Sequence, residues 1–214
     1  MKHALLRQLT LLLLIIPMAA AVNAQPTRYS AGTHYTELDS SVRTADPDKV
    51  EVLEVFWYGC NHCFRFQPLL ESWNDNKADD VHFERFPAIW NGLMQVHAQA
   101  YYTAVSLDVV DQVHEEIFNA INLRGNRLMN ENQLAELFSN NGVDEEAFRE
   151  AFNSFSVRTR VNRTERLMSD YQIQSTPNVV VNGKYLVSTS QAVSSQQEML
   201  DVVDFLVERE RAEL

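Results

Sequence analysis

Apolar and polar residues follow two different periods along the chain, and the period changes twice. Apolar residues fall on both faces of 50–58, as in a strand that is buried on both sides. Residues 81–86 alternate apolar and polar side chains, which indicates a second strand. Because 61–76 between them has helical spacing, the pattern predicts a strand–helix–strand unit. The polar lead-in over 25–46 predicts only a short edge strand near Tyr35.

The middle of the chain is predicted to be helical throughout. From Gly92 to about Tyr171, apolar residues recur every three or four positions. Asn130 and Asp144 carry the polar side chains that favour the first position of a helix. The clearest helical spacing falls in 98–107, 110–121, 132–140 and 145–155. The pattern therefore predicts an all-helical block of roughly 75 residues.

Strands return after this block. The dipeptide Asn182-Gly183 between the apolar runs 178–181 and 184–187 is typical of a tight hairpin turn. A Ser-Gln-Gln-Glu capping box then opens a final amphipathic helix over 195–211. The whole order describes a small α/β unit that is interrupted by a helical insertion.

The first 24 residues predict a cleavable export signal. Lys2 and Arg7 give it a positive start, 9–16 form an apolar core, and 22–24 fit a cleavage site. The apolar core is shorter than the about 20 residues that span a membrane, so an uncleaved anchor is the less favoured alternative. Export predicts a bacterial periplasm, where disulfides persist.

The charge of the chain is strongly acidic. The net charge is −11, and removal of the export signal takes away Lys2 and Arg7 but no acid, which leaves −13. Nucleic-acid binding requires a basic surface, so the composition excludes that class. The remaining 190 residues are enough for one core with a second subdomain packed on it.

Chemistry is concentrated at the junction between the first strand and helix. Cys60 and Cys63 are the only cysteines, and two thiols at this spacing can form a disulfide with little backbone movement. Cys60 lies at the predicted helix start, where N–H groups and the helix dipole favour a thiolate, so we expect it to be the attacking thiol. We expect Cys63 to be the resolving thiol and His62 to place a positive or hydrogen-bonding group beside the Cys60 sulfur.

Two other interpretations of the cysteine pair are an inert disulfide and half of a zinc site. A structural zinc site requires four ligands, and the other histidines show no pairing typical of ligands. We therefore expect redox exchange, with no metal and no cofactor.

Two further positions are candidates for the site. Thr176-Pro177 precedes the returning strand, where a cis bond would expose the Thr176 backbone to an extended substrate, although local sequence alone favours trans. Glu54 lies six residues before Cys60 in the buried strand. It is either a buried group near Cys63 that accepts or hands over a proton, or a strand-edge acid that is neutralised by Lys184 or left in water.

Together these features resemble DsbA-type periplasmic thiol:disulfide oxidoreductases. The resemblance rests on the strand with Glu54, the Cys60-Asn61-His62-Cys63 motif, the helical insertion, Thr176-Pro177 and Val181-Asn182-Gly183-Lys184-Tyr185. It implies an α/β fold, a thioredoxin fold with an inserted all-helical domain, in which 88–171 separates 25–87 from 172–214. It also implies that Pro177 is cis and faces the cysteines.

The resemblance further implies what the protein does. Members of this family donate their disulfide to reduced, newly exported polypeptides, and a DsbB-type quinone-linked membrane partner reoxidises them. Two residues depart from the best-known pattern: Asn61 replaces a proline and Thr176 replaces a valine. We expect a monomer. Isomerases of this kind resemble dimers built through an added N-terminal domain, and the lead-in before Val50 is too short for one, which argues against that function.

Two alternatives remain open at this point. One is a disulfide isomerase or reductase on the same fold, which Thr176 keeps in consideration. The other is a periplasmic chaperone that uses the Cys60–Cys63 disulfide only as a staple, with aromatic and methionine side chains near the motif lining a groove.

Overall fold

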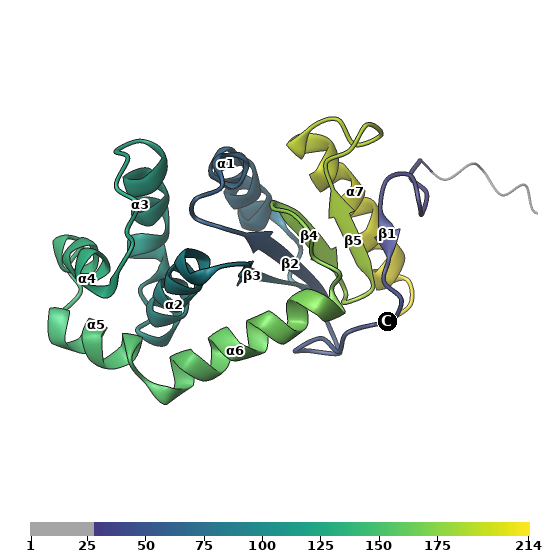
Figure 1. Ribbon diagram of the computed structural model, residues 1–214. Helices are drawn as coiled ribbons and strands as arrows, with labels where there is room; N and C mark the ends of the chain where they lie inside the picture. The colour runs from purple at the N-terminus through teal and green to yellow at the C-terminus, as the bar shows by residue number, and fades with distance from the viewer. Residues whose placement is uncertain (1–27) are drawn as a thin grey trace, which may run out of the picture.

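The computed structural model describes residues 28–214 (Figure 1). The predicted export signal, residues 1–24, lies outside the described residues. Among residues 28–214, no helix is both long and apolar enough to cross a membrane.

A mixed five-stranded sheet forms the centre of the fold. Its strands are β1 (Thr36–Glu37), β2 (Val50–Phe56), β3 (Val81–Pro87), β4 (Asn178–Val181) and β5 (Tyr185–Ser188). They lie in the order β1-β5-β4-β2-β3, in which only β2 and β3 are parallel. β2 is buried along its whole length, as its apolar residues on both faces predict. The expected edge strand near Tyr35 is β1.

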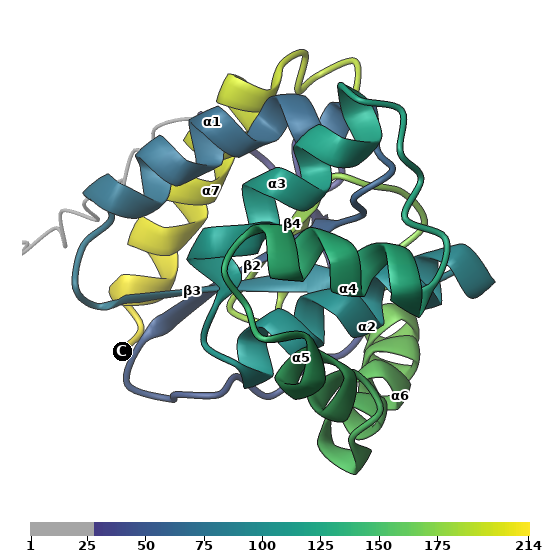
Figure 2. The same cartoon turned by 90° about the vertical axis from the view of Figure 1, so that its left-hand side faces the viewer.

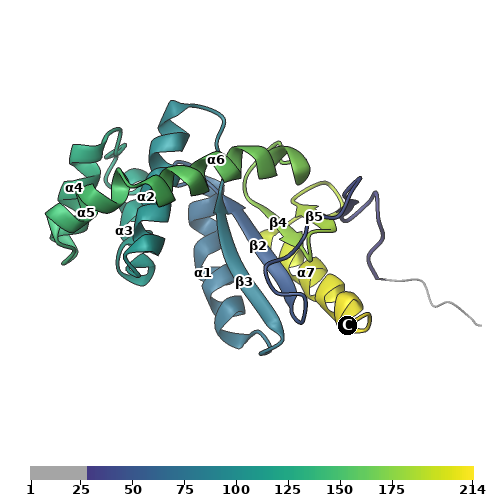
Figure 3. The ribbon, with the colours of Figure 1, turned by 90° about the horizontal axis from the view of Figure 1, so that it is seen from below.

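Helices cover both faces of this sheet. α1 (Asn61–Asn76) and α7 (Gln196–Arg211) lie side by side on one face, as Figure 2 shows. α6 (Phe155–Asp170) returns from the helical part of the chain to the other face (Figure 3). The apolar side chains of β2 alternate between these layers: Val52 packs with the α1–α7 side and Leu53 packs with the end of α6. The strand thus supports two cores at once.

The insertion contains four more helices on one side of the sheet. They are α2 (Gly92–Ser106), α3 (Val110–Asn122), α4 (Glu131–Asn140) and α5 (Glu145–Phe152). Asn130 and Asp144 cap α4 and α5 by accepting backbone N–H groups, as predicted. Their apolar faces meet in one core, which also contains Cys63.

One predicted helix boundary was wrong. The helical block begins at Gly92 as predicted, where the side chain of Asn91 caps α2 by accepting the Met94 N–H. The helix expected over 145–155 is two helices. α5 ends at Phe152, and the Ser154 hydroxyl accepts the Val157 N–H and starts α6. Apolar spacing continues across this break, so periodicity alone did not reveal it.

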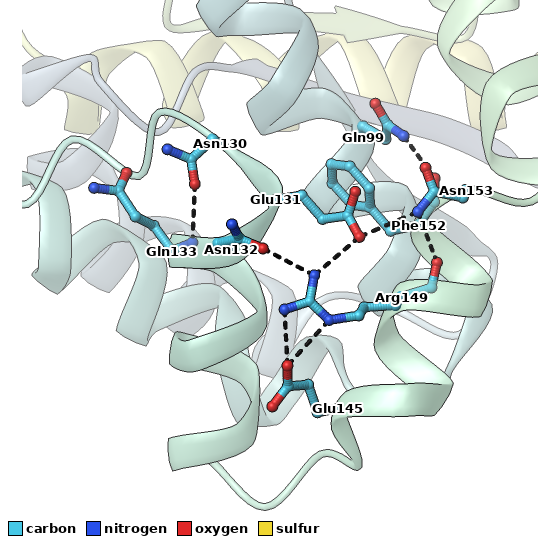
Figure 4. Close-up of polar contacts among 9 residues, drawn as sticks. All are labelled: Gln99, Asn130, Glu131, Asn132, Gln133, Glu145, Arg149, Phe152 and Asn153. Carbon is cyan, nitrogen blue, oxygen red and sulfur yellow. Dashed lines mark hydrogen bonds and ion pairs between the residues drawn. The ribbon is translucent and has the colours of Figure 1, made fainter.

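Polar side chains join α4 to α5, as Figure 4 shows. The Arg149 guanidinium donates to Glu145 at 2.7 Å, to Glu131 at 3.2 Å and to Asn132 at 3.0 Å. These groups are partly exposed, so each ion pair contributes at most about 1 kcal/mol. The network therefore joins the two short helices but adds little to the stability of the fold.

The predicted hairpin joins β4 to β5. Asn182 and Gly183 both have positive φ, as the tight turn requires. A Cβ on Gly183 would lie 2.0 Å from the Val42 carbonyl oxygen, so only glycine fits there. Lys184 lies in the turn, and β5 begins one residue later than expected. Ser195 caps α7 by accepting the Glu198 N–H, which confirms the predicted start.

Candidate active site

The two cysteines lie where β2 ends and α1 begins. Cys60 is the N-cap of α1, and its Sγ accepts the Cys63 N–H at 3.2 Å. Cys63 lies one turn further in and is completely buried, whereas Cys60 is partly exposed. Both thiols are free in this structure. An incoming reactant therefore reaches the Cys60 sulfur first.

A tight turn before Cys60 holds the motif in place. The Cys60 N–H donates to the Trp57 carbonyl at 2.9 Å. The Trp57 indole packs over Gly59, where a Cβ would lie only 2.3 Å from the ring. The indole is itself held by its N–H bond to His97 Nδ1 at 3.0 Å. Gly59 was not among the predicted site residues, although a glycine directly before the motif was the available signal.

Several donors stabilise a thiolate at Cys60. They lower the pKa of the Cys60 thiol from 9.0 to about 6, first through the Cys63 S–H and then through the Thr176 hydroxyl and the N–H groups of Cys63 and His62. Partial burial opposes this shift. Near neutral pH, the exposed sulfur is therefore largely ionised.

The environment of Cys63 has the opposite effect. Burial raises the pKa of the Cys63 thiol far above its ordinary value, and the neighbouring Cys60 and the Glu54 charge raise it further. An ionised Cys63 is thus unfavourable, and this sulfur requires a proton when it leaves a disulfide. The two sulfurs are suited to different roles: Cys60 to attack and Cys63 to resolve.

The structure brings Thr176-Pro177 to the cysteines across a long sequence separation. The Thr176–Pro177 peptide bond is cis, so the local preference for trans was wrong and the expectation from the family resemblance is confirmed. The Thr176 carbonyl oxygen lies 3.5 Å from Cys60 Sγ and accepts a hydrogen bond when the thiol is protonated. The carbonyl favours the thiol and the Thr176 hydroxyl favours the thiolate.

His62 contributes to the site through its backbone. Its side chain is exposed, and the ring Nδ1 lies 3.0 Å from the Arg65 guanidinium. His62 lowers the pKa of Cys60 through its backbone N–H, which is one of the several donors to that sulfur. The His62 carbonyl accepts the Gln196 side chain at 2.7 Å, which fastens the start of α1 to the start of α7.

Glu54 is fully buried in β2. Its Oε1 accepts the Gln67 Nε2–H at 2.8 Å, and its Oε2 lies 3.3 Å from Arg85 Nε. Burial raises the pKa of the Glu54 carboxyl to about 7, against the lowering effects of Arg85 and Gln67. The alternative that Lys184 neutralises this acid was wrong, because Lys184 Nζ pairs with Glu210 at 2.6 Å.

The sequence analysis also missed the partners of Glu54. Arg85 lies directly across from Glu54 in the parallel pairing of β2 with β3, and its guanidinium also contacts Glu71. Gln67 is four residues after Cys63 and therefore on the same face of α1. Arg85 occupies a position of the alternating strand 81–86 where an apolar residue is expected, and Gln67 lies on a buried helix face; these were the available signals.

No metal centre is evident in the described part of the chain. Between residues 28 and 214, no group of three or more His, Cys, Asp or Glu side chains is placed to hold a metal ion.

The fold and the site define a thiol:disulfide oxidoreductase. Its features are a thioredoxin-like sheet, an exposed low-pKa cysteine at a helix N-terminus, a buried partner cysteine and a cis proline beside them. This arrangement exchanges a disulfide with a second dithiol through a mixed disulfide.

The chain belongs to the DsbA family. A family model described as a DSBA-like thioredoxin domain matches residues 80–201, more than half of the chain. The thiol:disulfide interchange protein DsbA of Pseudomonas aeruginosa is 39% identical over 189 residues, which are 88% of this chain and 89% of that protein. DsbA of Azotobacter vinelandii is 38% identical over 192 residues, which are 90% and 89% of the two chains.

Solved structures agree with this assignment. The crystal structure of Pseudomonas aeruginosa DsbA matches with a TM-score of 0.83 and 38% identity, over 86% of this chain and 96% of that one. DsbA from Xylella fastidiosa matches with a TM-score of 0.81 and 31% identity, over 86% and 98% of the two chains. The predicted thioredoxin fold with a helical insertion is thereby confirmed.

Proposed function

We propose that this protein donates its Cys60–Cys63 disulfide to reduced, newly exported polypeptides in a bacterial periplasm. The observation that supports this direction is the difference between the two thiols. The low pKa of Cys60 makes it a good leaving group and stabilises the reduced protein, and whatever stabilises the reduced form makes the disulfide a stronger oxidant. The predicted export signal supports the location.

The exchange proceeds in two displacements. A substrate thiolate attacks the Cys60 sulfur, the S–S bond breaks, and the electron pair leaves on Cys63. A second substrate thiolate then attacks the substrate sulfur of the mixed disulfide and releases Cys60 as a stable thiolate. The substrate loses two electrons and the protein gains them.

Glu54 has the proton that this scheme requires. With a pKa of about 7, part of the Glu54 population is protonated at neutral pH and protonates the departing Cys63 sulfur. In the reverse direction, the carboxylate accepts that proton when Cys63 attacks. Glu54 and Cys63 are both completely buried.

Thr176 and Pro177 bind the substrate. Thr176 and Pro177 present an extended backbone beside the exposed sulfur, and an unfolded chain pairs with it through main-chain hydrogen bonds. His62 supplies an N–H bond to the Cys60 thiolate. A quinone-linked membrane protein of the DsbB type reoxidises the monomer after each cycle.

Equilibration with glutathione buffers tests the proposed direction. We expect the protein to remain largely reduced until glutathione disulfide is in large excess, as for a strong oxidant. A protein that stays oxidised in reducing buffer would contradict this and support a reductase.

A second candidate function is isomerisation of wrong disulfides. It is favoured by the Thr176 hydroxyl, which helps to lower the pKa of Cys60 and keeps its thiolate available for attack on a substrate disulfide. Refolding of a scrambled multi-disulfide protein separates the two, because an oxidant alone does not restore its native pairing.

A further inference from the structure

A buried chain of hydrogen bonds connects Glu54 to the helical insertion. Gln67 Nε2 lies 2.8 Å from Glu54 Oε1, and Gln67 Oε1 lies 3.2 Å from His114 Nε2. His114 Nδ1 lies 2.8 Å from the Tyr58 hydroxyl. None of the four side chains belongs to a residue more than 9% exposed.

The partners fix the direction of every bond in this chain. Because the Gln67 amide group donates to Glu54, its oxygen faces His114, and His114 Nε2 must carry the hydrogen. Burial and the Arg85 charge hold the pKa of His114 well below its ordinary value, so the ring is neutral and Nδ1 is bare. Nδ1 then accepts from Tyr58, whose hydroxyl burial keeps protonated. All donors point toward Glu54.

The other groups around Glu54 leave a specific role for this chain. Arg85 approaches from β3 at 3.3 Å, but the contact leaves both Arg85 Nε and Glu54 Oε2 without a well-aligned hydrogen bond. Glu71 of α1 opposes the Glu54 charge from beyond Arg85. Tyr101 of α2 and Cys63 of α1 are both buried, which raises the pKa of each, and the Glu54 charge raises both pKa values further. The aligned bond to Glu54 therefore comes from Gln67.

The orientation of Gln67 depends on a residue outside the thioredoxin-like part. A glutamine amide has two orientations, and only one directs its N–H to Glu54. His114, on α3 of the insertion, selects that orientation because its Nε2–H requires an oxygen. We propose that His114 is a positioning residue, through which the helical insertion orients the Gln67 amide and sets the protonation of Glu54 during disulfide exchange. This rests on the proton role given to Glu54 under the proposed function.

The unmodified protein provides the first test. In ¹⁵N NMR spectra at neutral pH, His114 should show a hydrogen on Nε2 and none on Nδ1. The opposite tautomer would overturn the proposal, because the Gln67 oxygen would then have no donor.

Variants provide the second test, through titration of the ¹³C-labelled Glu54 carboxyl. His114→Leu should raise its midpoint by about one pH unit, since the amide is no longer held and a bond to the charged carboxylate is lost. His114→Gln keeps an N–H that can reach the Gln67 oxygen. This variant should bring the Glu54 midpoint most of the way back to its value in the unmodified protein. Tyr58→Phe should cause a smaller shift in the same direction. It remains informative if His114→Leu does not fold.

The matched control is Tyr102→Phe. Like Tyr58→Phe, it removes one tyrosine hydroxyl, here the part-buried partner of Thr164 at 2.6 Å, and should leave the Glu54 midpoint unchanged. A midpoint that is equal in all variants would show that Gln67 is held without His114 and would refute the proposal.

The pH dependence of interchange separates this proposal from the role of Glu54. If the midpoint moves and the break in the pH–rate profile moves with it, both ideas hold. If the midpoint moves and the rate profile does not, His114 positions Gln67 as proposed and the proton role of Glu54 fails.

Discussion

The difference in stability between the reduced and the oxidised protein should depend on pH. In the reduced form the fold lowers the pKa of Cys60 from 9.0 to about 6, and the disulfide abolishes this titration. A group with a depressed folded pKa stabilises the fold fully above its unfolded pKa, and this contribution is lost as pH falls through the folded pKa. The reduced form should therefore gain stability, relative to the oxidised form, as pH rises.

The magnitude follows from about 1.4 kcal/mol per pKa unit. Linkage gives almost no contribution at pH 5, about 1.4 kcal/mol at pH 7 and about 2.7 kcal/mol at pH 8. Because Cys60 is partly exposed, we discount these to about 1 and about 2 kcal/mol for solvent screening.

For the proposed strong oxidant, the reduced form should be the more stable one at neutral pH, and it should gain about 2 kcal/mol relative to the oxidised form from pH 5 to pH 8. Above that pH the raised pKa of Cys63 begins to oppose folding of the reduced form, so the window ends there. Urea unfolding of both forms at several pH values measures the difference in stability. A difference that is constant from pH 5 to 8 would refute the thiolate argument.

Four further outcomes are expected at single positions. Cys60→Ser should abolish interchange, while Cys63→Ser should accumulate substrates as mixed disulfides, and mass spectrometry that finds adducts on the wrong variant would reverse the roles. Glu54→Gln should slow interchange about tenfold and remove a break near pH 7 from the pH–rate profile; an unchanged profile in stopped-flow measurements would exclude its proton role. Gly59→Ala should destabilise the protein by about 1–3 kcal/mol in urea unfolding, because its Cβ would overlap the neighbouring indole; stability equal to that of the unmodified protein would show that the indole moves freely. Thr176→Val should change the glutathione equilibrium more than it changes the unfolding free energy, and the reverse result would make this hydroxyl structural.

The insertion has a chemical as well as a structural relation to the cysteines. Cys63 packs in the core of the helical insertion together with Phe56 and Phe118. The same helical part reaches Glu54 through His114 and Gln67. Movement of the insertion relative to the sheet would therefore change the surroundings of both Cys63 and Glu54.

The sequence by itself determined the helix starts, the hairpin turn and the position of the cysteine motif, because each depends on a few neighbouring residues. The capping residues Asn130, Asp144 and Ser195 start their helices as predicted, since each needs only its own side chain and the next three N–H groups. The Asn182-Gly183 turn and the cysteine pair at a helix start are likewise decided within a few residues.

Only the tertiary structure decided which distant groups meet. It places Thr176 beside Cys60, pairs Glu54 with Arg85 across β2 and β3, and gives Lys184 to Glu210 instead of Glu54. These contacts join residues that lie far apart in the chain, and their energies depend on burial and strand register, which no local pattern records. The sequence by itself determined the chemistry of the two thiols, and the packing of the sheet against the insertion decided their pKa values.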